Sequence, residues 1–160
     1  MSEKQAQRKV DDSRTVTEIL AFPADANTAG NVYGGRILFW VDMVASLVAR
    51  KHCGSAVATI RTEFDFREPV RVGDHLRLEA FITATFRRSF EVQVDVCIGR
   101  NYGRPERLAG RGYLVFSCLD EAGKAREVEP ISVSTEEESE RRRAAEERRE
   151  LRKQWRKLEP

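Results

Sequence analysis

Two features are missing from this sequence of 160 residues: a long hydrophobic run and a large excess of one charge. No apolar stretch approaches the ~20 residues that a helix needs to span a bilayer, so we expect no membrane segment. With 28 basic and 26 acidic residues the net charge is +2, which does not indicate a nucleic-acid-binding protein. Residues 1–13 are polar, lack the apolar core of a signal peptide, and are expected to form a flexible arm.

Cysteine and histidine are also scarce. The three cysteines (Cys53, Cys97 and Cys118) and the two histidines (His52 and His75) have neither CxxC spacing nor the spacing of a zinc site. An odd number of cysteines without such spacing predicts no disulfide framework and no metal site. It is also typical of a protein of the reducing cytoplasm, which is the location we expect.

What the sequence does contain is a change of hydrophobic period along the chain. Residues 36–51 are apolar on nearly all faces and contain neither Gly nor Pro, which predicts a helix surrounded by other elements. Strands are predicted over residues 14–22, 57–66, 75–86, 89–98 and 107–118, mostly from alternation of apolar and polar residues. Short turns between the later strands favour antiparallel pairing. We therefore expect an α+β domain over residues 14–133, with a curved antiparallel sheet wrapped around one central helix.

The C-terminal residues 134–160 are expected to form a second, highly charged helix. Residues 136–158 hold nine Lys/Arg and seven Asp/Glu, an excess of two that equals the net charge of the whole chain. Two overlapping capping boxes mark its start, and a short apolar stripe marks its end: Thr135 with Glu138, Ser134 with Glu137, and then Leu151, Trp155 and Leu158. The pattern favours a solvated helix, and the stripe leaves open docking on the domain or on a neighbour.

A single acid interrupts the predicted central helix. Between residues 37 and 49 every side chain is apolar except Asp42 and Ser46. An ionised carboxylate is costly to bury without partners, so the sequence leaves two interpretations for Asp42. Either Asp42 takes part in a reaction, since a partly desolvated carboxylate is a better base, or it only forms a hydrogen bond with a neighbouring loop.

The loop before this helix offers further candidates. Asn27 either forms a turn or supplies an uncharged amide to a substrate. Gly34 and Gly35 precede the helix, where glycine permits close approach of a ligand to free backbone N–H groups, although Gly35 equally suits close packing. No Gly-Lys-Ser/Thr follows, so this is not a Walker loop.

Three stretches carry a resemblance to a known family: NTAGNVYGGRILFWVD, FREPVRVGD and RRSFEVQVDV. In their order and spacing they resemble the hotdog-fold acyl-CoA thioesterases, the group with the bacterial YciA-type enzymes and the brain-type acyl-CoA hydrolase. The likeness covers roughly residues 15–153, including a charged C-terminal helix. It implies a hotdog fold and hydrolysis of acyl-CoA to a carboxylic acid and CoA, without a metal or redox cofactor.

The resemblance implies roles for four residues in catalysis. Asp42 matches the helical Asp that acts as general base or nucleophile, and Asn27 matches a catalytic Asn contributed by the other subunit of a dimer. Gly35 would stabilise the oxyanion through its backbone N–H. Thr59 lies where the family often has a polar residue near that Asp, although the alternation places Thr59 on the polar face of its strand.

The resemblance also implies a coenzyme A site and an assembly. Ser89 matches a Ser or Thr near the pantetheine arm, and Arg87 and Arg88 would meet the phosphates of CoA, because guanidinium groups suit phosphates. Family members form double-hotdog dimers, often assembled into trimers of dimers, which implies a homo-oligomer here.

Departures and alternatives remain. The segment YLVFSCLD replaces a family stretch that usually ends in Val-Ala before the Asp, so Ser117 and Cys118 are expected to alter local packing. Neither histidine resembles the catalytic histidine of hotdog dehydratases. A module that binds acyl-CoA without cleaving it, and an interaction protein that uses the charged tail, are the alternative functions.

Overall fold

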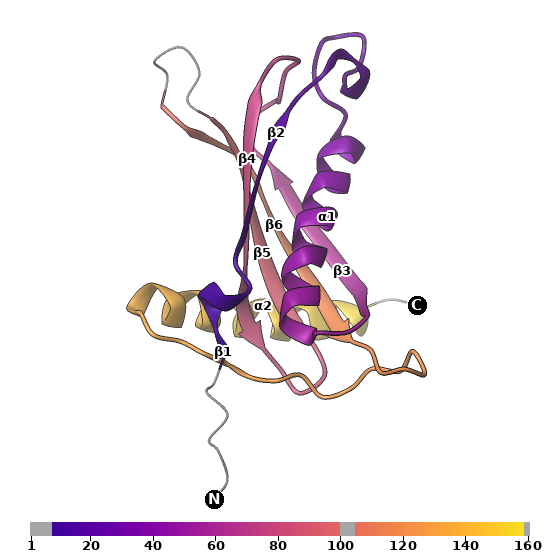
Figure 1. The fold of residues 1–160 in the computed structure, drawn as a ribbon, viewed down its shortest axis with the longest axis vertical. Helices are drawn as coiled ribbons and strands as arrows, with labels where there is room; N and C mark the ends of the chain where they lie inside the picture. Colours follow the sequence, from indigo (N-terminus) through magenta and orange to yellow (C-terminus); the bar gives the residue numbers. More distant parts are fainter. Residues whose placement is uncertain (1–7, 100–104, 159–160) are drawn as a thin grey trace, which may run out of the picture.

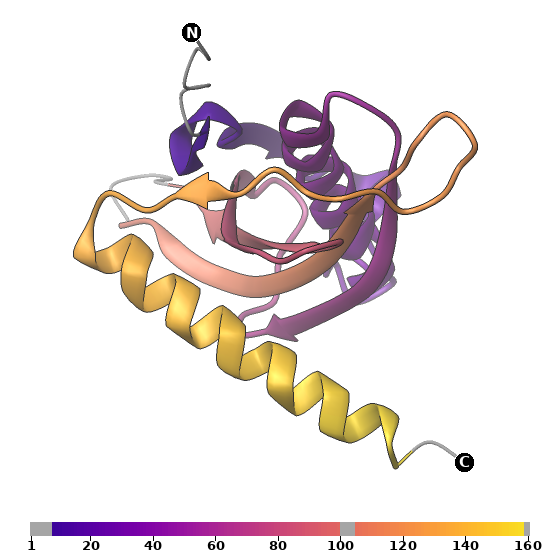
Figure 2. The same cartoon turned by 90° about the horizontal axis from the view of Figure 1, so that it is seen from below.

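The structure is a computed structural model that describes residues 8–99 and 105–158. Its centre is a five-stranded antiparallel sheet in the order β2-β4-β5-β6-β3. The main elements are β2 (Thr15–Leu20), α1 (Gly34–Cys53), β3 (Val57–Phe66), β4 (His75–Thr85), β5 (Phe90–Ile98), β6 (Arg107–Cys118) and α2 (Glu136–Arg156). Short elements complete the described chain: β1 (Arg8–Lys9), η1 (Val10–Asp12), η2 (Pro23–Asp25) and β7 (Ile131–Ser132). Figures 1 and 2 show α1 on one face of the sheet and α2 on the other.

Helix α1 fills the concave face of the sheet and extends two residues beyond each end of the predicted range 36–51, so Gly34 and Gly35 form its first two residues and do not precede it. Gly54 follows it in the left-handed conformation, with φ of 63°, and its N–H donates to the Arg50 carbonyl. The expectation that α1 is covered on all sides is wrong within one chain. Phe39, Met43 and Leu47 are 58%, 39% and 44% exposed, because the sheet wraps only part of the helix.

Strand β3 departs from regular alternation at one position. It forms the edge of the sheet next to β6, where Thr59 pairs with Phe116 and Arg61 with Val115, so Ile60 is bulged. A bulge reverses the side on which the residues before it point relative to those after it. The expected placement of Thr59 on the outward polar face is therefore wrong, and its hydroxyl faces α1.

The glycines of β6 explain how the sheet accommodates an aromatic ring. A Cβ on Gly112 would lie 2.8 Å from the ring of Phe64, and one on Gly110 would overlap the same ring. Glycine at these two positions therefore lets the Phe64 ring of β3 lie against the backbone of β6.

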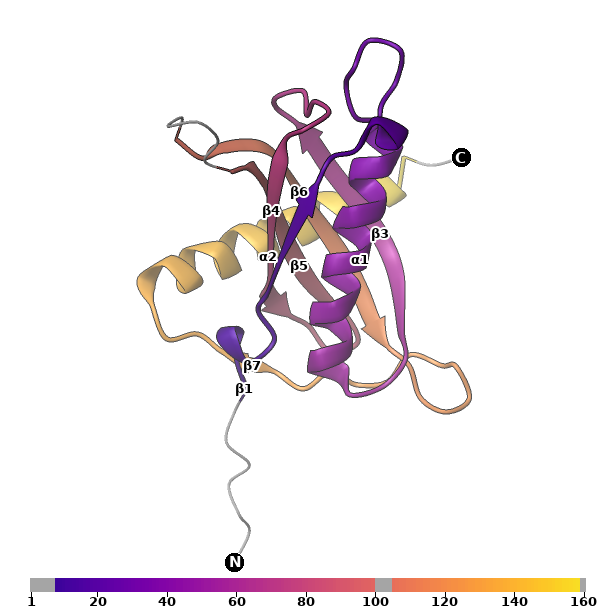
Figure 3. The same cartoon turned by 45° about the horizontal axis from the view of Figure 1, so that its top comes forward.

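Helix α2 is not a solvated helix, contrary to the favoured interpretation of its charges. It crosses the outer face of the sheet (Figure 3), and two of its own residues, Ala145 and Arg152, are buried. The capping box of Thr135 and Glu138 is confirmed, and Glu138 also accepts from the Ser134 N–H. The apolar stripe at its end remains exposed, so α2 docks through arginines and not through the stripe.

The prediction that the cysteines form no disulfide is also wrong. Cys53 at the end of α1 and Cys118 at the end of β6 are bonded, with their Cα atoms 5.6 Å apart. They are 65 residues apart in sequence, so their meeting depends on how α1 packs against the sheet. Cys97 is free.

The N-terminal segment differs from the expected arm over residues 8–13. Arg8 and Lys9 pair in parallel with Ile131 and Ser132, and Val10 is buried. No described helix is both long and apolar enough to cross a membrane. No group of metal-ligating side chains of the size a metal site needs occurs within residues 8–99 and 105–158.

Candidate active site

Asp42 and Thr59 meet at the edge of the sheet. The Thr59 hydroxyl on β3 donates to the Asp42 carboxylate on α1 across 3.3 Å. Asp42 lies on the same exposed face of α1 as Met43, and its expected burial within the chain is therefore wrong. The carboxylate is exposed among apolar side chains, which is the environment that a second molecule would turn into a cleft.

Asn27 organises the loop before α1. The side-chain oxygen of Asn27 accepts hydrogen bonds from the backbone N–H groups of Ala29 and Asn31, at 3.0 and 3.2 Å. The backbone N–H of Asn27 donates to the Asn31 carbonyl. The turn-forming role is therefore present. The side-chain NH₂ group donates to no acceptor among the described residues, so it remains available to a ligand.

The start of α1 presents unpaired donors. The N-cap residue Tyr33 supplies no side-chain cap, and the N–H groups of Gly34 and Gly35 have no acceptor within the described chain. A Cβ on Gly35 would meet no described atom within 4 Å, whereas one on Gly34 would lie 3.3 Å from Phe66. Within the described chain, a larger residue would crowd Phe66 at position 34 but would have free space at position 35. Packing within one chain therefore does not explain a glycine at position 35.

One chain does not bring all four candidates together. Gly35 and Asp42 are seven residues apart on α1, roughly 10 Å along its axis. Asp42 and Thr59 form one hydrogen-bonded group, whereas Gly35 lies at the start of α1 and Asn27 in the loop before it.

The residues expected to hold CoA lie on the β4–β5 turn. Arg87 pairs with Glu127, and both side chains are more than 70% exposed. Arg88 and Ser89 line a groove on the outer face of the sheet, beside α2. The Ser117 hydroxyl donates to the Arg88 carbonyl at 2.7 Å, so this departure from the family pattern positions the turn.

The basic residues that α2 contributes to this groove were not predicted from the sequence as site residues. The basic residues in the second half of the helix were visible, but they were expected to be solvated. Only the docking of α2 across the sheet brings them beside Arg88.

Comparison with known proteins agrees with this architecture. The model of the thioesterase superfamily matches residues 29–102. A Bacillus subtilis protein named uncharacterized acyl-CoA thioester hydrolase YkhA is 31% identical over 128 residues, which cover 79% of this chain and 74% of the relative. The chain belongs to the thioesterase superfamily.

Solved structures place this thioesterase-superfamily protein among the hotdog folds. An apo-hexameric acyl-CoA thioesterase is 37% identical with a TM-score of 0.90, covering 94% of this chain and 97% of that one. The acyl-CoA hydrolase of Staphylococcus aureus, solved with butyryl coenzyme A, coenzyme A and its disulfide, is 30% identical with a TM-score of 0.88. Those matched regions cover 93% and 92% of the two chains. The expected hotdog fold is confirmed.

Proposed function

We propose that this protein is a homo-oligomeric acyl-CoA thioesterase, which hydrolyses acyl-CoA to a carboxylic acid and CoA. The names of its relatives support the reaction class and the substrate class. The observation that carries the proposal is the hydrogen bond from Thr59 to Asp42 on an otherwise apolar face of α1.

The spacing of the candidate residues supports their assignment. The S. aureus hydrolase was crystallised as variants in which an Asn, an Asp or a Thr is replaced by Ala. These positions are separated by 15 and 17 residues, and Asn27, Asp42 and Thr59 have the same two intervals. We assign these three residues to the reaction on that basis.

In the proposed reaction Asp42 activates the attack on the thioester carbonyl. As a general base it takes a proton from water, and the hydroxide oxygen bonds to the carbonyl carbon. As a nucleophile its own oxygen attacks, and water then hydrolyses the mixed anhydride. Either route expels the CoA thiolate, which takes up a proton. The Thr59 hydroxyl donates to Asp42 and fixes the carboxylate that reacts.

Asn27 and Gly35 are proposed to stabilise the oxyanion. The Asn27 amide and the Gly35 N–H are donors without partners in the described chain, and such donors act most strongly where negative charge develops. Gly35 lies about two helical turns from Asp42 on α1, and Asn27 lies in the loop before the helix, so we propose that both serve the Asp42 of a partner subunit.

The exposed face of α1 is the proposed interface between the two copies. Phe39, Met43 and Leu47 form an exposed apolar patch of the kind that usually marks a protein–protein interface. Pairing two such faces would enclose Asp42. Two related thioesterases are hexameric, and we propose a trimer of such dimers for this protein. The reaction uses only water and the side chains named, so we expect no metal or redox cofactor.

The test is release of free thiol from acyl-CoA substrates of increasing chain length. We expect Asp42→Ala to reduce kcat by at least 100-fold, because the base or nucleophile is lost. Glu121→Ala, which removes a carboxylate from an exposed turn, is the matched control. Equal rates for Asp42→Ala and the wild-type protein would contradict the assignment of Asp42. A wild-type protein that binds acyl-CoA without releasing thiol would contradict the enzymatic function.

A further inference from the structure

The outer face of the sheet carries a groove of about 280 Å³ that is lined by cations and by no carboxylate. It lies between the start of β3, the β4–β5 turn and the second half of α2. Its basic residues are Arg61, Arg88, Arg149, Arg152, Lys153 and Arg156. A concave site with six positive charges and no acid favours an anion.

Half of these cations are held by acids, and half are not. Arg61 and Arg152 pair with Glu63, and Lys153 pairs with Glu150. No ion pair involves Arg88, Arg149 or Arg156 within residues 8–99 and 105–158. These three guanidinium groups therefore retain their charge for a ligand.

Arg149 is held in place without being neutralised. Its guanidinium carbon lies 4.4 Å from the centroid of the Phe86 ring on the β4–β5 turn. Stacking on an aromatic face orients a guanidinium while leaving the N–H groups at its edge free to bind an oxyanion.

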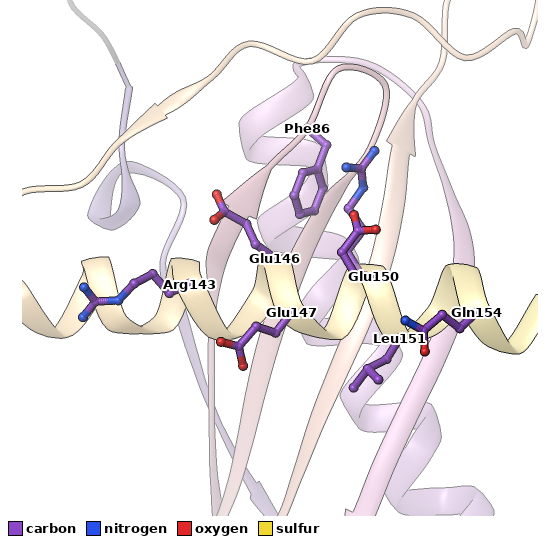
Figure 4. Close-up of a pocket in the computed structure, with 8 residues that line it drawn as sticks. Phe86, Arg143, Glu146, Glu147, Glu150, Leu151 and Gln154 are labelled. Atoms are coloured by element: carbon purple, nitrogen blue, oxygen red, sulfur yellow. The ribbon is translucent and has the colours of Figure 1, made fainter.

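The cavity on the other side of Phe86 has the opposite character. It is larger, about 810 Å³, and three carboxylates line it beside two guanidinium groups (Figure 4): Glu146, Glu147 and Glu150 with Arg143 and Arg149. The acids outnumber the bases there, whereas the smaller groove has no acid, so charge and not size distinguishes the two cavities. An anionic ligand is therefore expected in the smaller groove.

The groove adjoins the candidate active site through a single strand. Thr59 faces Asp42, and the next residue, Ile60, lines the groove. The bulge at Ile60 produces this arrangement, and β3 is the edge strand of the sheet. A long ligand that passes the edge of β3 can thus place one end at Asp42 and the other end among the cations. The exposed Ile60 side chain offers apolar surface along that path.

We propose that helix α2 is part of the substrate site, where Arg149 and Arg156 join Arg88 to bind the phosphate groups of the CoA portion. Acyl-CoA has the required shape, because its pantetheine chain separates the thioester from the phosphates. The inference rests on the proposed function and assigns to α2 a specificity for phosphorylated thioesters.

The test measures binding of CoA and of pantetheine by calorimetry, and hydrolysis of acyl-CoA and of acyl-N-acetylcysteamine. Arg88→Gln combined with Arg156→Gln removes two exposed cations that have no ion-pair partners to lose. The control is Arg142→Gln, an exposed arginine of α2 that lies outside the groove and pairs with Glu146. We expect the double variant to weaken CoA binding and raise KM for acyl-CoA by tenfold or more. Pantetheine binding, kcat and hydrolysis of acyl-N-acetylcysteamine should stay unchanged, and CoA binding should depend less on salt.

Unchanged affinity for CoA in the double variant would overturn the proposal. A second outcome would also overturn it: adenosine 3′,5′-bisphosphate binds to the protein but does not compete with acyl-CoA. The groove would then be a nucleotide site separate from the substrate site. A wild-type protein that cleaves neither thioester would overturn the proposed function instead. The CoA titration would still decide the role of α2 in that case.

Discussion

At the scale of single residues, the bulge at Ile60 has the largest consequence. Without it, the alternation along β3 would direct Thr59 away from α1. With it, the Thr59 hydroxyl reaches the Asp42 carboxylate, while Ile60 turns to the groove. One extra residue in an edge strand therefore decides which of these two neighbouring side chains faces α1 and which faces the groove.

We expect Thr59→Val to lower kcat by about 10- to 100-fold, because a hydrogen bond to a charged group contributes ~1.5–3 kcal/mol. Thr59→Ser should retain most activity, since it keeps the hydroxyl. Thr62→Val, the same change two pairs along β3, is the control. Steady-state thiol release gives kcat for each variant, and a fully active Thr59→Val would show that the hydrogen bond is dispensable.

His52 gives the stability a dependence on pH. Burial lowers the pKa of His52 and outweighs the opposing hydrogen bond between its Nε2 and the Glu129 carbonyl, while Arg8 and Arg126 lower it further. The unfolded chain takes up a proton as the pH falls through about 6.5, whereas the folded chain resists it. The free energy of unfolding should therefore decrease below about pH 6.5, by at most ~1.4 kcal/mol per pH unit, and level off below the folded pKa.

Urea unfolding between pH 5 and 8 measures this contribution. His52→Gln should flatten the slope just below pH 6.5, because it removes the group that burial keeps from taking up a proton. Identical slopes for the wild-type protein and His52→Gln would exclude His52 as the titrating group.

At the scale of elements, a buried carboxylate attaches α2 to the sheet. Glu91 on β5 is fully buried, and it accepts from Arg148 at 2.6 Å, Arg152 at 2.7 Å and Thr83 at 2.7 Å. Arg152 also bonds Glu63. Burial alone would lower the pKa of Arg152, but its bonds to these two carboxylates raise it. The same contact with Arg152 lowers the pKa of Glu63 against the opposing effect of burial.

We expect Glu91→Gln to destabilise the protein by ~3–5 kcal/mol, because it leaves two arginines facing a neutral group at a buried position. Glu127→Gln is the matched control: its pair with Arg87 is exposed, and such pairs contribute ~1 kcal/mol or less. Chemical denaturation measures both changes, and equal losses for the two variants would mean that Glu91 does not attach α2.

At the scale of the whole molecule, the exposed face of α1 is the proposed interface with a second copy. We expect Leu47→Asp to give a monomer without thioesterase activity, because the change places a charge in the proposed interface and separates the proposed catalytic residues of the two copies. Leu151→Asp makes the same change at a similarly exposed position of α2 and should remain assembled. Sedimentation velocity beside the thiol-release assay decides the matter, and an active Leu47→Asp monomer would place the whole site within one chain.

The compartment also belongs to this scale. Cytoplasmic location stays a prediction, and the bond between Cys53 and Cys118 argues the other way, since disulfides persist mainly in oxidising environments. The cysteine pattern gave no sign of this bond, because 65 residues separate the two positions and only the packing of α1 on β6 joins them.

The sequence alone determined what depends on near neighbours in the chain. Hydrophobic period predicted α1 and the strands, and the capping pair Thr135 and Glu138 predicted the start of α2. These features follow from contacts within a few residues, so a local pattern is sufficient to predict them. The resemblance added the family, and with it the assignment of Asp42.

Only the tertiary structure decided what depends on distant segments meeting. It set the direction of Thr59, the bond between Cys53 and Cys118, the exposed face of α1, and the arginines by which α2 docks. The helix pattern of α2 is compatible with a solvated helix and with a docked one. The choice depended on Glu91, a buried acid about 60 residues earlier in the sequence, whose charge has to be balanced where the sheet and α2 meet.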